Sequence, residues 1–82
     1  MVTVTDIKIY GNILTAKYYP EGQNKDLGFI EYDLVKKQVI EIHYCEADRD
    51  SFLKAYAYKA VMALKNHPEN ESWPVQLHNF WY

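Results

Sequence analysis

The sequence predicts a small α+β fold: a four-stranded antiparallel β-meander packed against one C-terminal amphipathic α-helix, followed by an ordered, aromatic-rich tail. Residues 2–45 contain four stretches in which apolar and polar residues alternate, as in strands with one buried face. Residues 49–66 contain no Gly or Pro and repeat apolar residues at three- and four-residue steps, which is typical of an amphipathic helix. We therefore expect one domain over residues 1–82, with the tail at residues 67–82.

The first two strands are predicted at residues 2–10 and 13–19, joined by the turn Gly11-Asn12. Both turn residues tolerate positive φ, which a two-residue hairpin connection requires. The turn fixes a register in which apolar residues face each other on one side of the sheet and opposite charges on the other. The facing pairs are Ile9 with Leu14, Ile7 with Ala16, and Asp6 with Lys17.

A second hairpin is predicted from residues 27–34 and 38–45, with the three-residue connection Val35-Lys36-Lys37 between them. The connection contains no glycine, so its turn type stays open. The register that follows sets three facing pairs: Tyr32 with Ile40, Ile30 with Ile42, and Glu31 with Glu41.

The helix is predicted to run from Arg49 to Asn66. Asp48 or Asp50 can accept hydrogen bonds from the free N–H groups of its first turn. Asn66 can adopt the left-handed conformation that ends many helices, and Pro68 prevents continuation. The apolar positions that define its buried side are Leu53, Tyr56, Ala57, Ala60, Val61 and Leu64.

One helix is too narrow to cover the predicted sheet. Four strands at about 4.8 Å spacing span roughly 14–19 Å, whereas a helix with its side chains is about 10–12 Å across. The tail, or a second copy of the chain, must therefore cover the rest of the apolar face. The tail aromatics expected at this interface are Trp73, Phe80, Trp81 and Tyr82. The tyrosines expected to point inward are Tyr32, Tyr44 and Tyr56.

The composition argues against several classes of protein. The formal net charge of −2 gives no overall attraction to nucleic acid or to an anionic membrane. No apolar run approaches the roughly 20 residues of a membrane span, and the first residues lack the basic and apolar regions of a signal peptide. The single cysteine, Cys45, excludes an internal disulfide. We therefore expect a cytoplasmic protein that does not contact membranes.

The second face of the predicted sheet mixes polar and aromatic side chains, and this is where we expect a contact surface. An ordinary solvated sheet face is the alternative, and it stays open. The register assigns to this face Lys8, Tyr10, Ile13, Thr15, Lys17, Tyr19, Phe29, Glu31, Asp33, Glu41, His43 and Cys45. The candidate binding residues among them are Tyr10, Lys17, Tyr19, Phe29, Glu31, Glu41 and His43.

Three chemistries on this face are disfavoured. His43 and Cys45 lie two apart on a strand, so their Cα atoms would be about 6.6–6.8 Å apart, which is too far for a direct thiol–imidazole pair. Metal binding by Glu41, His43 and Cys45 matches no zinc spacing. Glu31 and Glu41 could share a proton as an acid–base pair, but two exposed acids explain them as well. We therefore expect no metal site, no cofactor and no catalytic residue.

The lead hypothesis is a small non-enzymatic binding protein that self-associates as a homodimer. Three alternatives stay open. The first is a small-ligand site or an enzyme site between helix and sheet, and the second is a regulator or inhibitor carried by a phage or other mobile element. The third is a platform for single-stranded nucleic acid, suggested by lysines interleaved with aromatics and opposed by the nearby acids.

Overall fold

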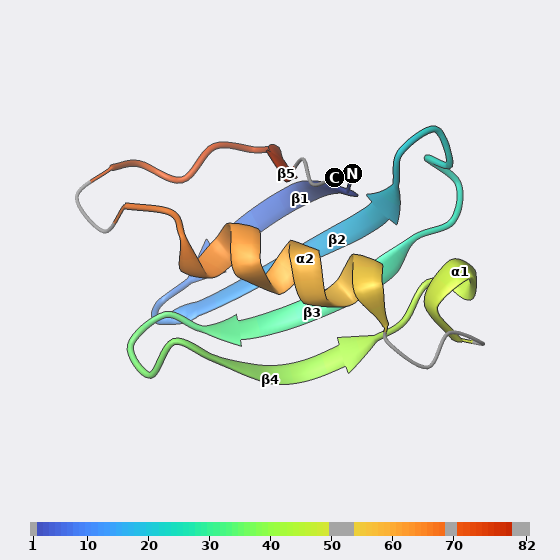
Figure 1. Ribbon diagram of the computed structural model, residues 1–82. Coiled ribbons are helices and arrows are strands. Elements are labelled where there is room, and N and C mark those ends of the chain that lie inside the picture. The colour runs from blue at the N-terminus through green and yellow to red at the C-terminus, as the bar shows by residue number, and fades with distance from the viewer. Residues whose placement is uncertain (1, 50–53, 69–70, 80–82) are drawn as a thin grey trace.

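The computed structural model describes residues 2–49, 54–68 and 71–79. Its strands are β1 (Val2–Tyr10), β2 (Ile13–Pro20), β3 (Gly28–Asp33), β4 (Gln38–His43) and β5 (Leu77–Asn79). Its helices are α1 (Glu46–Arg49) and α2 (Ala55–Lys65). The predicted fold class is confirmed, because β1–β4 form an antiparallel meander followed by a helix that crosses one face of the sheet (Figure 1).

The tail adds a fifth strand to the sheet. Strand β5 pairs antiparallel with β1, with Val4 opposite Leu77 and Val2 opposite Asn79, which gives the strand order β4-β3-β2-β1-β5 (Figure 1). Trp73, in the segment between α2 and β5, is half-buried against the core. The described part of the tail therefore packs on its own sheet. The other tail aromatics that we predicted at an interface, Phe80, Trp81 and Tyr82, lie outside the described residues.

The core lies between α2 and the sheet. Alternation along β2 and β3 places every second side chain in this layer, as the sequence predicts. From α2 the buried residues are Ala57, Ala60 and Leu64, spaced on one side of the helix. The sheet contributes Val2, Val4, Leu14, Ala16, Tyr18, Ile30 and Tyr32.

Strand β1 contains a bulge that the predicted register does not include. Ile9 faces Leu14 as predicted, but the pairing of Ile7 with Ala16 is wrong, because the register shifts between Thr5 and Lys8. Asp6, at the shift, has a φ of 52°. A bulge changes which face the following residues occupy. Val2 and Val4 therefore face the core before the shift and Ile7 packs on it afterwards, while Asp6 turns to solvent.

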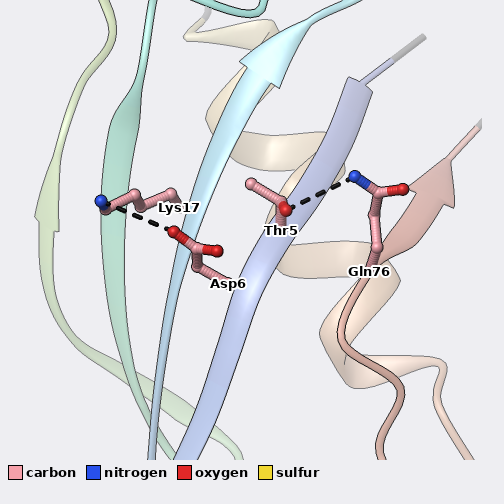
Figure 2. A network of polar contacts seen from close by, with 4 residues as sticks. All are labelled: Thr5, Asp6, Lys17 and Gln76. Atoms are coloured by element: carbon pink, nitrogen blue, oxygen red, sulfur yellow. Dashed lines mark hydrogen bonds and ion pairs between the residues drawn. The ribbon is translucent and has the colours of Figure 1, made fainter.

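The bulge also anchors the segment that leads into β5. Figure 2 shows Asp6 paired with Lys17 across the hairpin, with 3.6 Å between the Lys17 Nζ and an Asp6 oxygen, so the predicted charge pair forms although Thr5 is the register partner of Lys17. The Gln76 side-chain amide donates to Thr5 Oγ1 at 3.4 Å (Figure 2), and the Ile7 N–H donates to the Val75 carbonyl at 3.2 Å. The Thr5 hydroxyl and the Ile7 N–H, on the two sides of Asp6, thus hold the C-terminal segment against β1.

The second hairpin has a four-residue connection instead of the predicted three. Leu34 belongs to the turn, and Lys37 closes it with a φ of 55°. The Asp33 carboxylate accepts from the N–H groups of both Val35 and Lys36 at 2.9 Å, which fixes the turn without a glycine.

The longer turn shifts part of the β3–β4 register. Ile30 faces Ile42 as predicted, and Glu31 faces Glu41. The predicted pairing of Tyr32 with Ile40 is wrong, because the register slips by one residue and Tyr32 faces Val39. Ile40 is therefore the unmatched residue of a second bulge, and it is half exposed, at 50%.

The helix begins later than predicted. Lys54 has a left-handed backbone, with φ 50° and ψ 45°, so α2 starts at Ala55 and the short α1 is a separate element. The Lys54 ammonium donates to the Asp48 and Arg49 carbonyls at 2.9 and 2.8 Å, which caps the end of α1. Asn66 stays right-handed, with φ −85°, so the predicted left-handed stop is wrong. The predicted helical position Leu53 and the alternative cap Asp50 lie outside the described residues.

Asp48 caps the helix, as predicted, but from a distance and from inside the protein. Its carboxylate is fully buried and accepts from the N–H groups of Tyr56 at 3.1 Å and Ala57 at 2.7 Å, in the first turn of α2. The Tyr18 hydroxyl donates to the same carboxylate at 3.0 Å and accepts from the Cys45 N–H at 3.2 Å. Burial, reinforced by the bond to Asp48, raises the pKa of Tyr18 far above its usual range, whereas the Cys45 N–H opposes the shift. This cluster joins β2, α1 and α2.

Candidate functional site

The seven candidate binding residues share the face of the sheet opposite α2. Cross-strand pairs connect several of them, with Lys17 opposite Phe29, Phe29 opposite His43 and Glu31 opposite Glu41. The rings of Phe29 and His43 lie 6.0 Å apart. Tyr10, Lys17, Glu41 and His43 are exposed, while Tyr19, Phe29 and Glu31 are half-buried. The face is an open surface of mixed charge, and its role in binding remains a prediction.

The two facing glutamates do not form an isolated acid–base pair. Glu41 Oε1 lies 3.3 Å from His43 Nε2 on the same strand, so imidazole is the nearest partner of that carboxylate. Both side chains of this Glu41–His43 pair are well exposed, at 59% and 66%. Water therefore competes for both side chains of this pair.

Cys45 does not lie on the solvent face, and this prediction is wrong. Strand β4 ends at His43, so the two-residue alternation stops before Cys45, and the cysteine turns into the core with 1% exposure. Burial raises the pKa of its thiol, although an N–H donor in the Asp48 backbone opposes the shift. His43 and Cys45 therefore point to different environments, and the pair cannot act as a nucleophile and its base.

The burial of Cys45 predicts low chemical reactivity. At about pH 8, we expect iodoacetamide to alkylate the native protein on the order of 100-fold more slowly than the urea-unfolded chain, since only an exposed thiolate reacts. Mass spectrometry of timed samples measures both rates. Equal rates in the two states would contradict the burial of this thiol.

A groove opens where the β3–β4 turn meets the C-terminal end of α2. These two segments lie at the same end of the molecule (Figure 1). The groove has a volume of about 410 Å³, within the usual range for small-molecule sites. The Trp73 indole stacks on the His67 imidazole, with ring centroids 4.0 Å apart and an interplanar angle of 27°. The lining residues are Tyr32, Leu34, Val35, Lys37, Leu64, Lys65, His67 and Trp73.

The Tyr32 hydroxyl is the one buried side-chain polar atom without a hydrogen-bond partner among residues 2–49, 54–68 and 71–79. Tyr32 is 2% exposed, and burial raises its pKa, an effect that the nearby Lys37 ammonium opposes. Leaving a buried hydroxyl without a partner costs about 1–3 kcal/mol, so such a group invites a functional explanation. The groove thus combines apolar walls with cationic side chains and an unsatisfied donor.

Among the described residues, no strand pairs with the outer edge of β4. Helix α2 packs mainly on β1, β2 and β5, so apolar side chains beside β4 stay exposed. Tyr44, which we predicted to point inward, is 37% exposed because it follows the end of the strand. A shallow groove of about 280 Å³ separates β4 from α2. It is lined by Ile42, Tyr44, Lys54, Ala57, Tyr58 and Val61.

Comparison with family models, with curated proteins and with solved structures finds no match to this chain. In the part of the chain that the structure describes, no three His, Cys, Asp or Glu side chains come together as a potential metal site. No helix in that part is both long enough and apolar enough to cross a membrane. The candidate sites therefore depend on the geometry of this chain alone.

The sequence analysis singled out only part of the groove. It placed Tyr32 inward, which is confirmed. It placed Trp73 at an interface, and in the structure Trp73 packs against the core of its own chain. It placed Lys65 and His67 only as cations at the C-terminal end of the helix and Lys37 only in the hairpin connection, because no spacing in the sequence links a hairpin turn to a helix end. Only the tertiary fold brings the β3–β4 turn next to the C-terminal end of α2.

Proposed function

We propose that the chain is a non-enzymatic interaction protein whose partner is a second copy of itself, bound along the edge of β4. The proposal is supported by the outer edge of β4, which no described strand pairs with and which lies beside exposed apolar side chains. These are Ile40, Val39 and Tyr58, with 50%, 38% and 59% exposure. An open edge presents unpaired N–H and C=O groups that another strand can satisfy. The other edge strand, β5, is only three residues long.

The second bulge limits which part of β4 can pair. The register slip lies next to Ile40, so regular backbone remains only from Glu41 onward. Beyond the strand, Cys45 is buried and its N–H donates to the Tyr18 hydroxyl, so it cannot pair with another chain. The usable edge is therefore short, and side chains from α2 must contribute to the contact.

Charge selects one register within this short edge. Antiparallel partners must lie on the same face of the sheet. A pairing centred on Glu41 would put two carboxylates directly opposite each other, which is destabilising. A pairing centred on Ile42 puts Glu41 opposite His43 of the second copy, twice by symmetry, and brings Ile40 to Tyr44 of the second copy. In this register a carboxylate faces an imidazole on one side of the joined sheet, and apolar side chains face each other on the other side.

A charge exchange tests the register. We expect the protein to dimerise at micromolar concentration in sedimentation equilibrium. His43→Glu should raise the dimer dissociation constant roughly tenfold, because two carboxylate–carboxylate pairs replace two carboxylate–imidazole pairs. Adding Glu41→Lys to that variant should restore the original constant, since the paired signs are again opposite. Far-UV circular dichroism establishes that each variant remains folded.

A second pair of variants tests the apolar contact. Ile40→Lys should weaken the dimer by at least the same factor, whereas Val75→Lys, which changes a side chain of 71% exposure away from β4, should leave it unchanged. A wild-type protein that sediments as a monomer throughout the micromolar range would overturn the proposal. So would a dimer that Ile40→Lys and His43→Glu leave intact.

A further inference from the structure

We infer that the contact proposed along β4 holds a divalent transition-metal ion, with zinc as the best match, bound by Glu41 and His43 of each copy. The inference rests on that contact, because one chain supplies only half of the ligands. Among the described residues of one chain, no three His, Cys, Asp or Glu side chains are close enough to hold a metal ion. The site is therefore complete only in the dimer.

Within one copy, Glu41 and His43 already lie at the spacing that zinc requires. They are two residues apart on β4, so both side chains leave the same face of the sheet. Glu41 Oε1 lies 3.3 Å from His43 Nε2. Two oxygen or nitrogen ligands on a tetrahedral zinc ion, at its usual bond lengths, are about 3.3–3.5 Å apart. An ion can therefore bind both atoms with little movement of either side chain.

The register centred on Ile42 brings the second pair of ligands to the first. It puts Glu41 opposite His43 of the second copy, and the two-fold symmetry repeats this pairing. Side chains directly opposite each other in an antiparallel pair have Cβ atoms about 4.5–5.5 Å apart. Two carboxylates and two imidazoles therefore converge on one face of the joined sheet, and four such ligands complete the tetrahedral shell of zinc.

The charge of the cluster favours a dication. The Glu41 carboxylates of the two copies carry two negative charges, which one Zn²⁺ ion balances. Glu31, opposite Glu41 on β3, adds a further carboxylate to each copy. Lys17 on β2 has its ammonium 3.6 Å from Asp6, which offsets its charge. An ion bound here therefore removes the repulsion between the acids of the two copies.

The ligand types select among the divalent ions. Imidazole nitrogen suits zinc and its neighbours among the transition metals, whereas Mg²⁺ and Ca²⁺ prefer shells of six or more oxygen ligands. The Glu41 and His43 side chains are well exposed, so an ion reaches them from solvent. Cys45 takes no part, because its side chain is buried in the core.

Sedimentation equilibrium of EDTA-treated protein, with and without added zinc chloride, tests the inference. We expect free zinc at about ten times its dissociation constant from the dimer to lower the dimer dissociation constant about tenfold, because the ion binds the monomer weakly. Magnesium chloride at the same concentration should have no effect. Native mass spectrometry should detect one zinc ion per two chains.

Matched variants locate the ligands. His43→Gln and Glu41→Gln should each reduce the effect of zinc to less than about twofold, whatever they do to the dimer without the ion, since each removes two of the four ligands. His67→Gln and His78→Gln replace the other two histidines of the chain, which lie after α2 and on β5, and should keep the full effect.

The outcomes separate the metal site from the contact on which it rests. Three results would overturn the metal site alone: a dimer that zinc leaves unchanged, a zinc ion bound to each monomer, or a zinc effect that His43→Gln preserves. A protein that stays monomeric throughout the micromolar range, with and without zinc, would overturn both the metal site and the contact.

Discussion

Replacing Asp48 with alanine is expected to lower the free energy of unfolding by roughly 3–4 kcal/mol. The carboxylate accepts from the Tyr18 hydroxyl and from the N–H groups of Tyr56 and Ala57, and all of this lies in the core. Each hydrogen bond to a charged group contributes about 1.5–3 kcal/mol, although the three are not additive. A domain of this size has a total stability of roughly 4–12 kcal/mol, so the variant is expected to be near the limit of folding.

Thermal and urea unfolding followed by circular dichroism measure this effect. A loss of 3 kcal/mol corresponds to a melting temperature lower by about 12–24 °C in a domain of this size. Glu46→Ala is the matched control, because Glu46 is an exposed acid on the same short helix. Asp48→Asn keeps one acceptor oxygen and should fall between the two. An Asp48→Ala protein as stable as Glu46→Ala would show that the cluster does not hold α2 to the sheet.

The sequence predicted the arrangement of this fold because periodicity reports burial. Alternation in the second and third strands placed Leu14, Ile30 and Tyr32 correctly, and the Gly11-Asn12 turn fixed the near end of the first hairpin. The width of the sheet relative to one helix predicted that the tail must pack, and β5 does so. Each of these features depends on many residues that all favour the same arrangement. A single sequence is therefore enough to predict them.

Three of the wrong predictions, the register of β1, the length of the β3–β4 turn and the start of the helix, coincide with three backbone positions. Asp6, Lys37 and Lys54 are the residues other than glycine with positive φ in the described part of the chain. Asp6 marks the bulge of β1, Lys37 closes the unexpected four-residue turn, and Lys54 breaks the helix predicted from residue 49. Few L-residues adopt this conformation, and lysine has no special preference for it. Tertiary contacts therefore impose it, and periodicity carries no signal for it.

The candidate groove was missed for a related reason. Its cations come from a turn and a helix end that are nearly 30 positions apart, and Lys37 is one of the residues whose placement depends on an irregular turn. Tyr18 was also missed as an inward residue, although it continues the alternation of Leu14 and Ala16 on β2. In that case the alternation of Leu14 and Ala16 was visible in the sequence. Extending it by two residues would have placed Tyr18, the hydrogen-bond partner of Asp48, in the core.

Gly28→Ala is expected to lower the free energy of unfolding by about 3 kcal/mol, for a steric reason. A Cβ at this position would overlap the Tyr18 ring and lie 2.8 Å from the His43 carbonyl oxygen. The ring cannot retreat easily, because its hydroxyl is held by the Asp48 carboxylate and the Cys45 N–H. The φ of Gly28 is not positive, so the loss comes from packing and not from backbone strain.

A double-mutant cycle separates this clash from a general effect of alanine in a strand. Tyr18→Leu removes the ring and opens space next to Gly28, so the double variant should be more stable than the sum of the single effects predicts, by at least about 1 kcal/mol. Gly22→Ala is the contrasting control: its Cβ would meet nothing within 4 Å, but its φ of 79° makes alanine unfavourable for conformational reasons alone. Its effect of about 1 kcal/mol should not change when Tyr18 is replaced. Strict additivity of Gly28→Ala with Tyr18→Leu would contradict the packing of this glycine on the tyrosine that anchors Asp48.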